Sequence, residues 1–313
     1  TTAEVRVGGP DDTTFGALAR SVVAALPQGQ GLVVAGSGSA PLARTGDLRP
    51  FVQVAGSGEP RALVNNRYSA DLVALGDPAV LRRTPDLPSD NALPRWLEEV
   101  ARTPVEDRPG HWRLAFDIDS PLDVLLAGIG EPPDGSIVGD RLDRVAATLR
   151  DRRGEVLVAG RTSAATLRLI ERQAASRTRA LVEERGLRAS SRLAFGGDDG
   201  RSHSARPPAS VLAMLLADRG PGALGRIVAD LADAAVVDSR VLMAARWGAD
   251  EGAWPRPEDR YASDLLLAER IEDPWLRDLT AAARDAPIPV VLGAHSMVGP
   301  GARLLLRRAR GRA

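Results

Sequence analysis

Two short apolar segments that each end in glycine limit what this chain can fold into more than any other feature of its sequence. Leu32–Gly36 and Val156–Gly160 are uninterrupted apolar runs, and a polar loop follows each of them. A short apolar run that opens into a loop is typical of a strand buried in a parallel sheet. Such strands alternate here with segments of helical spacing. The alternation predicts an α/β protein with an open, mostly parallel sheet flanked by helices.

Apolar spacing and cap residues predict the remaining elements. The predicted helices are 15–26, 93–101, 140–152, 163–185, 209–218, 222–235, 257–268, 274–285 and 302–308. The predicted strands are 32–36, 62–64, 112–116, 156–160 and 288–293. We expect Leu32–Ala35 and Arg113–Phe116 to lie parallel in one sheet, because a loop and a helix follow each of them.

The length of 313 residues fits two domains of roughly 150 residues each. Pro, Gly and Asp are concentrated between Glu131 and Gly139, and a second strand–helix alternation begins at Val156. We therefore place the boundary near Arg153-Gly154. This predicts a first α/β domain at 1–150 and a second α/β domain at 154–313.

The composition excludes several kinds of protein. The chain has no cysteine, which excludes a disulfide scaffold, a thiolate nucleophile and an iron–sulfur cluster. Its 41 basic residues balance 41 acidic ones and only 4% of the residues are aromatic, so we expect no nucleic-acid partner. Without a long apolar run or a signal-peptide pattern, we expect a cytoplasmic protein with no membrane partner. The oligomeric state stays open.

Asp117 and Asp119 are the first candidates for a functional site. They follow the predicted strand 112–116, and their spacing places both carboxylates on one side of the chain, ~7 Å apart. Open α/β sheets bind ligands at this edge, and carboxylates are ligands that Mg²⁺ prefers. In the alternative interpretation Asp117 accepts hydrogen bonds from loop amides, and Asp119 or Ser120 caps the following helix.

The same segment carries a resemblance to a known family. Asp117-Ile118-Asp119-Ser120-Pro121-Leu122-Asp123 resembles the D-I-D-T-P-x-D element of MobA-like nucleotidyltransferases, which include the phospholactate guanylyltransferases. The turn at Ser39-Ala40-Pro41-Leu42 is similar to the family's G-D-x-P-L turn. The resemblance covers about residues 20 to 127.

The resemblance implies a GT-A type fold and a reaction in which an acceptor phosphate attacks the α-phosphate of a nucleoside triphosphate. It implies that Asp117 and Asp119 hold Mg²⁺. It also implies that the nucleotide lies beside the loop made of Gly36, Ser37, Gly38 and Ser39. The partners would be a nucleotide and a phosphorylated small-molecule acceptor.

Two departures from the family pattern keep other functions open. Ser39 stands where the family has a metal-binding Asp, and no segment matches the family's glycine-rich loop with its Arg and Lys. The chain contains no lysine at all. One alternative is a catalytically inactive nucleotide-binding, ligand-binding or scaffolding protein on the same fold. Another is a nucleotide-sugar glycosyltransferase, which also uses paired aspartates and Mg²⁺.

Three clusters of polar residues complete the candidates. Asn65, Asn66 and Arg67 follow the predicted strand 62–64 and are candidates for binding the acceptor, with a capped turn as the alternative. Arg188 and Arg192 flank Ser190 and Ser191 and are candidates for binding an anion, with an ion pair to Glu183 or Glu184 as the alternative. His295 follows the last predicted strand and is a candidate acid or base, although such a turn also needs these residue types for structure.

Overall fold

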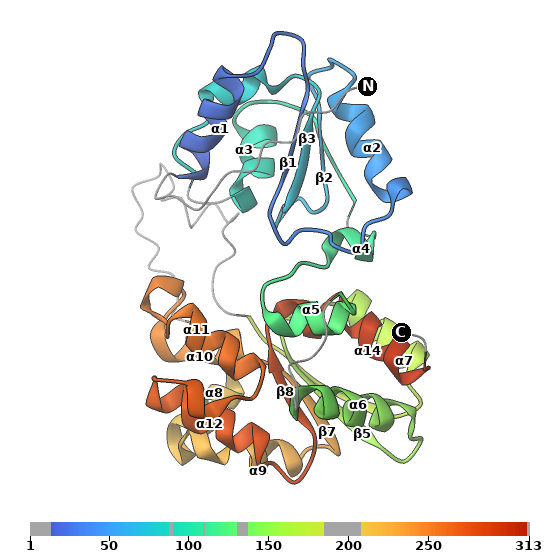
Figure 1. Ribbon diagram of the computed structural model, residues 1–313, viewed down its shortest axis with the longest axis vertical. Helices are drawn as coiled ribbons and strands as arrows, with labels where there is room; N and C mark the ends of the chain where they lie inside the picture. Colours follow the sequence, from blue (N-terminus) through green and yellow to red (C-terminus); the bar gives the residue numbers. More distant parts are fainter. Residues whose placement is uncertain (1–13, 88–89, 109, 130–136, 185–207, 312–313) are drawn as a thin grey trace. The chain divides into compact units, whose positions relative to one another are not determined.

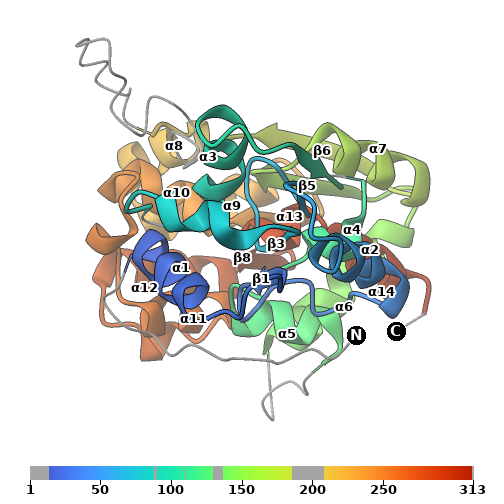
Figure 2. The same ribbon diagram turned by 90° about the horizontal axis from the view of Figure 1, so that it is seen from above.

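The computed structural model describes residues 14–87, 90–108, 110–129, 137–184 and 208–311 (Figure 1, and Figure 2 for a view turned by 90°). Within these residues the chain forms two compact units, and the first ends at Asp117. Each unit contains a four-stranded sheet with helices packed on its faces. The boundary that the sequence predicts near Arg153-Gly154 falls inside the second unit.

The sheet of the first unit mixes strand directions. Its order is β1-β3-β2-β4, formed by β1 (Leu32–Ala35), β2 (Ala62–Val64), β3 (Leu72–Leu75) and β4 (Val105–Asp107). Strand β3 runs antiparallel to both of its neighbours, whereas β2 and β4 are parallel. Only one of the three strand pairs in this sheet is therefore parallel.

Helices cover both faces of this sheet. The helical segments of the unit are α1 (Phe15–Ala24), α2 (Thr45–Ala55), η1 (Pro78–Arg83), η2 (Asp90–Ala92), α3 (Leu93–Glu99) and α4 (Trp112–Ala115). Helices α1 and α3 pack on one face with Val64 and Val73, while α2 and α4 pack on the other with Leu63 and Leu72. Successive strand residues thus enter opposite cores, which is the two-residue period of a strand.

Two predictions for the first unit are wrong. Trp112–Phe116 is not a strand, because Trp112–Ala115 forms α4, in which the Leu114 amide donates to the His111 carbonyl at 2.9 Å. In so short a segment, apolar alternation fits one helical turn as well as a strand. The parallel pairing of 32–35 with 113–116 is also wrong. Strand β1 instead pairs antiparallel with β3, which the sequence analysis did not predict.

The sheet of the second unit is entirely parallel. Its order is β6-β5-β7-β8, formed by β5 (Glu155–Gly160), β6 (Arg177–Val182), β7 (Ala234–Asp238) and β8 (Val290–Gly293). The longer helices are α6 (Ile137–Arg150), α7 (Ala164–Gln173), α8 (Val211–Arg219), α10 (Ser239–Trp247), α11 (Pro257–Asp264), α12 (Pro274–Arg284) and α14 (Ala302–Ala309). Shorter ones are α5 (Pro121–Ala127), α9 (Leu224–Ala229), α13 (His295–Val298), η4 (Pro221–Ala223), η5 (Glu251–Ala253) and η6 (Ala268–Arg270).

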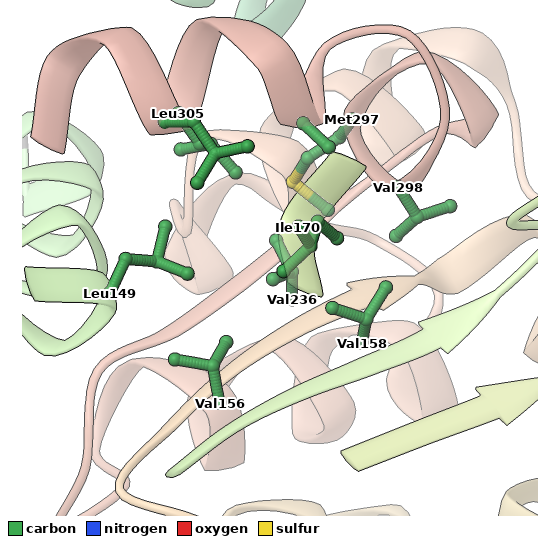
Figure 3. A pocket seen from close by; sticks show the side chains of 10 residues that line it. Leu149, Val156, Val158, Ile170, Val236, Met297, Val298 and Leu305 are labelled. Carbon is green, nitrogen blue, oxygen red and sulfur yellow. The ribbon is translucent and has the colours of Figure 1, made fainter. Parts of the chain in front are cut away.

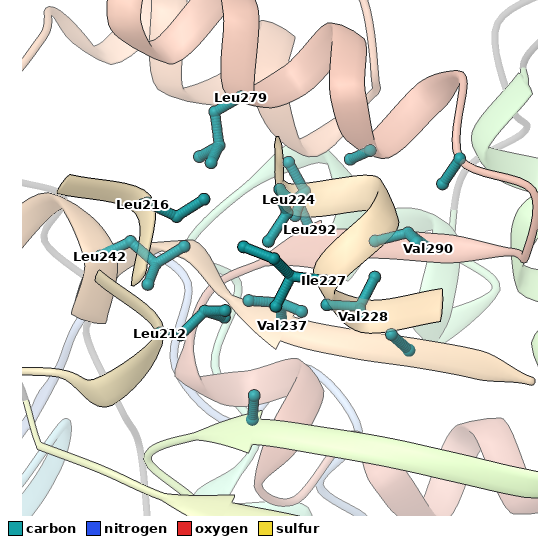
Figure 4. Close-up of a cluster of buried hydrophobic side chains, with 14 of the residues drawn as sticks. Leu212, Leu216, Leu224, Ile227, Val228, Val237, Leu242, Leu279, Val290 and Leu292 are labelled. Carbon is teal, nitrogen blue, oxygen red and sulfur yellow. The ribbon is translucent and has the colours of Figure 1, made fainter. Parts of the chain in front are cut away.

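Two apolar layers enclose this parallel sheet. On one face, side chains of α8, α9 and α12, among them Leu216, Ile227 and Leu279, surround Val237 and Leu292 of the sheet (Figure 4). On the other face, α6, α7, α13 and α14 cover Val156, Val158 and Val236 (Figure 3). Each fully buried side chain of this size stabilises the fold by about 1.5–3 kcal/mol. The layers explain why β7, which lies between β5 and β8, is buried at every position.

The sequence analysis missed two strands of the second unit. The predicted helix 163–185 is confirmed only in its first part, because α7 ends at Gln173 and the chain then forms β6. Strand β6 is mostly exposed, so it lacks the apolar run that marks a buried strand. The predicted helix 222–235 is likewise too long, since α9 ends at Ala229 and β7 begins at Ala234.

Polar N-cap residues determine where several helices begin. Ser163, Ser210 and Asp273 each accept a hydrogen bond from an amide in the first turn of the helix that follows. None of the helices in the described ranges has the length and apolar character of a membrane span, and the longest, α6, has 14 residues.

Candidate functional site

Several charged residues of the second unit lie at the carboxyl ends of its parallel strands. The chain leaves β5 for β6 on one side of the sheet and leaves β7 for β8 on the other, so the connections change direction between β5 and β7. In open α/β sheets, ligands bind beside the carboxyl ends of strands at such a point. Here Arg161 directly follows β5, and Asp238 is the last residue of β7.

Arg161 and Asp238 bind each other across this point. The Arg161 guanidinium donates to both oxygens of Asp238, at 2.6 and 3.1 Å. Burial alone would raise the pKa of Asp238, but the charge and hydrogen bonds of Arg161 outweigh burial and hold that pKa below its ordinary value. The electrostatic interaction with His295 also lowers the pKa of Asp238. The charges of Arg161 and Asp238, at the point where the connections change direction, are thus already paired with each other.

Arg240 and Asp264 form a second ion pair in the same unit. Arg240 donates to both oxygens of Asp264 at 2.7 and 2.6 Å, and both side chains are buried. Arg240 also donates to the Ser239 hydroxyl, which in turn donates to the Gly293 carbonyl at the end of β8. Burial raises the pKa of Asp264 even though Arg240 opposes this effect. The pair therefore connects α10, α11 and the end of β8 through one buried network.

The start of α5 adds two more carboxyl groups to this network. The Asp123 carboxylate accepts from the Asp119 amide at 3.0 Å and from the Ser120 hydroxyl at 3.2 Å, both through Oδ2. Its Oδ1 has no hydrogen-bond partner among the described residues, although the side chain is completely buried. Burial, and then the negative charge of Asp119, raise the pKa of Asp123 to about 7. Asp123 can therefore exchange a proton near neutral pH.

The balance of charge adds to the effect of burial on the pKa of Asp123. The network holds four carboxyl groups, those of Asp119, Asp123, Asp238 and Asp264, and two guanidinium groups. Each arginine is already bound to one aspartate, so within the described part of the chain neither Asp119 nor Asp123 forms an ion pair with a guanidinium group. Two neighbouring carboxylates resist being charged together, and the more buried one keeps its proton to higher pH.

A cavity of about 400 Å³ opens beside these residues. Its polar lining comes from Asp119, Ser120 and Tyr261. Its apolar lining consists of Ile118, Pro121, Val124, Leu125 and Leu265. The volume lies in the range that is typical of small-molecule sites. Because Ser120 both lines the cavity and donates to Asp123, its hydroxyl links the buried carboxyl group to the cavity.

A second space lies among the side chains of Figure 3, and it has a different character. Its volume is about 10 Å³, and its wall consists of apolar side chains such as Leu149, Ile170 and Met297. A space that is too small and too apolar to hold a hydrogen-bonded water is a gap in packing. It does not contribute to the candidate site.

The predicted nucleotide loop and one predicted metal ligand meet in the first unit. Ser39 forms an antiparallel bridge with Asp117, and the Ala40 amide donates to the Phe116 carbonyl at 3.2 Å. The Ser39 hydroxyl donates to the Gly36 carbonyl at 2.8 Å and so closes the loop on itself. Asp119 belongs to the second unit, so the predicted pair is divided between the two units. No group of three or more acidic or histidine residues with metal-binding geometry occurs within the described ranges.

The residues predicted to bind the acceptor have local partners. Asn65 is buried; its amide nitrogen donates to the Leu114 carbonyl at 2.8 Å, and its oxygen accepts from two backbone amides. The side-chain oxygen of Asn66 accepts from the Tyr68 amide. Arg67 donates to Glu98 and to the Val105 carbonyl. These contacts stabilise the turn after β2, and a role in binding an acceptor stays a prediction. Arg188 and Arg192 lie outside the described residues.

Sequence reasoning named only Asp119 of this network as a candidate and missed the other five residues, which are Asp123, Arg161, Asp238, Arg240 and Asp264. One signal was present: Val236-Val237-Asp238-Ser239 is an apolar run that ends in polar residues, like the strand ends that were predicted. Asp264 lies at the end of a helix, and no pattern in the sequence indicates that it pairs with Arg240.

The chain was compared with protein-family models, with curated proteins and with solved structures, and none of them matches it.

Proposed function

We propose that the second unit is an enzyme domain that performs acid–base chemistry on a small molecule bound in the cavity beside α5. One observation carries this proposal: the buried carboxyl group of Asp123 has a pKa of about 7 and is linked to the cavity through Ser120. A general acid or base is most effective when its pKa lies near the working pH. Strongly shifted pKa values also occur preferentially at functional sites.

The lining of the cavity indicates the kind of substrate. Five apolar residues form most of its wall, and among the described residues that line it Asp119 is the only charged one. A molecule with an apolar body and one hydroxyl or amino group would satisfy both parts of this surface. In this proposal Asp119 orients the polar group of the substrate, and Asp123 accepts or supplies a proton through the Ser120 hydroxyl.

Asp123 also has a structural role, since it is the third residue of α5 and accepts from the amide and hydroxyl at the start of that helix. A cap requires only an acceptor, whereas proton exchange requires a titratable group. Asp123→Asn separates the two roles, because asparagine keeps an accepting oxygen but does not titrate.

The test is a screen of small alcohols and amines by ligand-observed NMR on the full chain. Ligands of the cavity should lose their signal with Val124→Trp, which fills it, and should bind more weakly to Asp119→Asn. Asp278→Asn is the matched control, because Asp278 is an exposed carboxylate on α12. Binding to the unmodified chain should change with an apparent pKa near 7, and this dependence should vanish in Asp123→Asn. Ligands that bind all four variants alike would contradict the proposal.

A second candidate function concerns the first unit. The bridge between Ser39 and Asp117 places the predicted nucleotide loop beside a predicted metal ligand, and this favours nucleotidyl transfer. Mg²⁺ bound to a nucleotide needs only one or two carboxylates from a protein, and Asp117 would supply one. The bound ion would neutralise charge on the phosphates during attack by the acceptor. Because the loop carries a neutral hydroxyl at Ser39, a nucleotide-binding protein without transferase activity remains the alternative.

An assay for pyrophosphate release separates these two alternatives. With a nucleoside triphosphate, Mg²⁺ and phosphorylated acceptors, an active chain releases pyrophosphate and Asp117→Asn does not. Nucleotide binding without release would support the binding protein, and the absence of both would exclude this second function. A cytoplasmic location remains a prediction from the sequence.

A further inference from the structure

One carboxylate in the wall of the cavity beside α5 has no partner among the described residues. Asp119 lines this cavity and is half-buried. Its backbone amide donates to Asp123, but its side chain forms no hydrogen bond or ion pair within the described part of the chain. Asp238 and Asp264, by contrast, are each bound to an arginine. Asp119 is therefore the carboxylate of the network that a ligand can pair with.

The polar groups of the cavity mainly accept hydrogen bonds. A carboxylate such as that of Asp119 can only accept. The single hydrogen of the Ser120 hydroxyl is directed to carboxylates, those of Asp123 and Asp264, so that Ser120 offers a ligand its lone pairs. The Tyr261 hydroxyl has no hydrogen-bond partner among the described residues, and it can accept as well as donate. A ligand that matches these atoms is rich in donors.

The charges around the cavity favour a cation. Neither arginine nor histidine occurs among the described residues that line it, and the chain contains no lysine. The adjoining network holds four carboxyl groups and two guanidinium groups, so its net charge is negative even when Asp123 keeps its proton. An anion would be repelled there, whereas a cation would be attracted.

The remaining wall is aliphatic. Val124 and Leu125 of α5 and Leu265, which follows α11, contribute branched hydrocarbon side chains to it. These side chains keep water away from part of the Asp119 surroundings, and a lower dielectric strengthens the attraction between a carboxylate and a cation. They also provide a surface on which the hydrocarbon part of a ligand can pack.

We propose that this cavity binds a protonated aliphatic amine, whose ammonium group donates to Asp119 and Tyr261 while its hydrocarbon part packs against α5. The inference rests on the function proposed above and narrows its substrates from alcohols and amines to amines. An ammonium group carries three donors and no acceptor, which matches a site made mainly of acceptors. A hydroxyl carries one donor, and its own lone pairs would face the carboxylate.

A titration with matched probes tests this selection. The full chain is titrated by ligand-observed NMR at pH 7, where an alkylamine carries its proton as a lysine side chain does. The probes are cyclohexylmethylamine, cyclohexylmethanol and cyclohexanecarboxylate, which share one ring and differ in the polar group. We expect the amine to bind about tenfold more tightly than the alcohol, because a hydrogen bond to a charged group is the stronger one. The carboxylate should bind more weakly than both.

Asp119→Asn should remove the preference for the amine and leave the affinity for the alcohol nearly unchanged. Unchanged alcohol binding, together with circular dichroism, shows that the cavity of this variant is intact. Asp278→Asn, which removes an exposed carboxylate on α12, should keep the preference. If the folded Asp119→Asn variant still prefers the amine, Asp119 is not the group that recognises it, and the inference is overturned.

Salt provides a measurement that needs no variant. Sodium chloride should weaken binding of the amine and leave binding of the alcohol unchanged, because ions screen only the charged contact. Mg²⁺ at the same ionic strength should displace the amine no better than Na⁺. Stronger displacement by Mg²⁺ would show that Asp119 holds a metal ion, which would also overturn the inference.

Failure of this inference and failure of the proposed function give different results. If the alcohol binds as tightly as the amine and Val124→Trp abolishes both, the cavity is a small-molecule site that does not select amines. The inference then fails alone. If none of the probes binds, or if their binding survives Val124→Trp, the cavity is not the site and both proposals fail.

Discussion

Arg161 and Asp238 leave neighbouring parallel strands and bind each other through two hydrogen bonds, at 2.6 and 3.1 Å. The two paired side chains occupy the position between the ends of β5 and β7, where sheets of this kind bind ligands. Gly160 allows the close approach, because a Cβ at this position would lie 2.2 Å from the Cβ of Asp238. The accessible cavity lies instead beside α5 and α11, which is where we place the site.

Gly160→Ala should strongly destabilise the second unit. Gly160 has a φ of +128°, which a side chain rarely adopts, and the added methyl group would overlap Asp238. Backbone strain and overpacking together should lower the free energy of unfolding by about 2–5 kcal/mol. Urea unfolding measures this loss. Gly222→Ala is the control, since a Cβ there meets nothing within 4 Å. Equal losses for the two variants would contradict the argument.

Arg240→Met should cost more stability than the same substitution made together with Asp264→Leu. The single change leaves a buried carboxylate without its guanidinium partner, which costs about 3–5 kcal/mol. The double change removes both charges, and apolar replacements of a buried ion pair are often neutral. Denaturant unfolding of the two variants gives the comparison. If the double variant is less stable than the single one, the two residues do not act as a compensating pair.

Asp123→Asn should change how stability depends on pH. The folded pKa of Asp123 is about 7 and its ordinary value is 3.8, so between these pH values the folded chain keeps a proton that the unfolded chain releases. Asp123 therefore destabilises the fold as the pH rises from about 4 towards and through 7. The asparagine variant carries no such charge. Its stability relative to the unmodified chain should rise by about 4 kcal/mol between pH 4 and pH 8.

Chemical unfolding at several pH values measures this difference. Contributions from groups outside the site cancel, because both proteins carry them. A difference in stability that stays constant with pH would show that Asp123 titrates normally, and the proposed acid–base role would then fail as well.

Ser39→Asp should strengthen binding of a nucleotide with Mg²⁺ in the first unit, because it supplies the carboxylate that the family resemblance calls for at this turn. Ser39 and Asp117 are bridge partners, so the two carboxylates would lie close together. At 100 times the dissociation constant, bound nucleotide stabilises a protein by about 2.7 kcal/mol, which a melting curve detects. Ser37→Asp, in the same loop, is the control. An identical shift for both variants would count against a nucleotide site at Ser39.

The candidate site could be predicted only in part. The motif from Asp117 to Asp123 directed attention to the start of α5, because a short apolar segment followed by aspartates is visible in one stretch of sequence. Asp123 was part of the motif, but nothing local indicates that it is completely buried and lies near Asp119. Its raised pKa arises from burial by segments that are distant in the sequence.

There are physical reasons why the sequence analysis missed strands β6 and β3. Strand β6 is an exposed edge, so its residues carry no apolar pattern, and only its hydrogen bonds to β5 make it a strand. Strand β3 is fully buried, but it follows the predicted strand 62–64 after only a short loop. It was missed because no helix separates the two strands, as the predicted strand–helix alternation requires. Its antiparallel direction follows from that short connection.

Local patterns were enough to predict the α/β character of the chain, because apolar runs and helical spacing are properties that burial in any such fold requires. They also indicated several cap residues and the aspartates at the start of α5. The pairing of the strands, the division of the chain into two units and the partners of the buried charges depend on contacts between distant segments, which no local pattern specifies. Arg240 and Asp264 lie 24 residues apart in sequence and show no pattern that links them. Their pairing, and the shifted pKa of Asp123 beside it, exist only because the fold removes these groups from water at the same place.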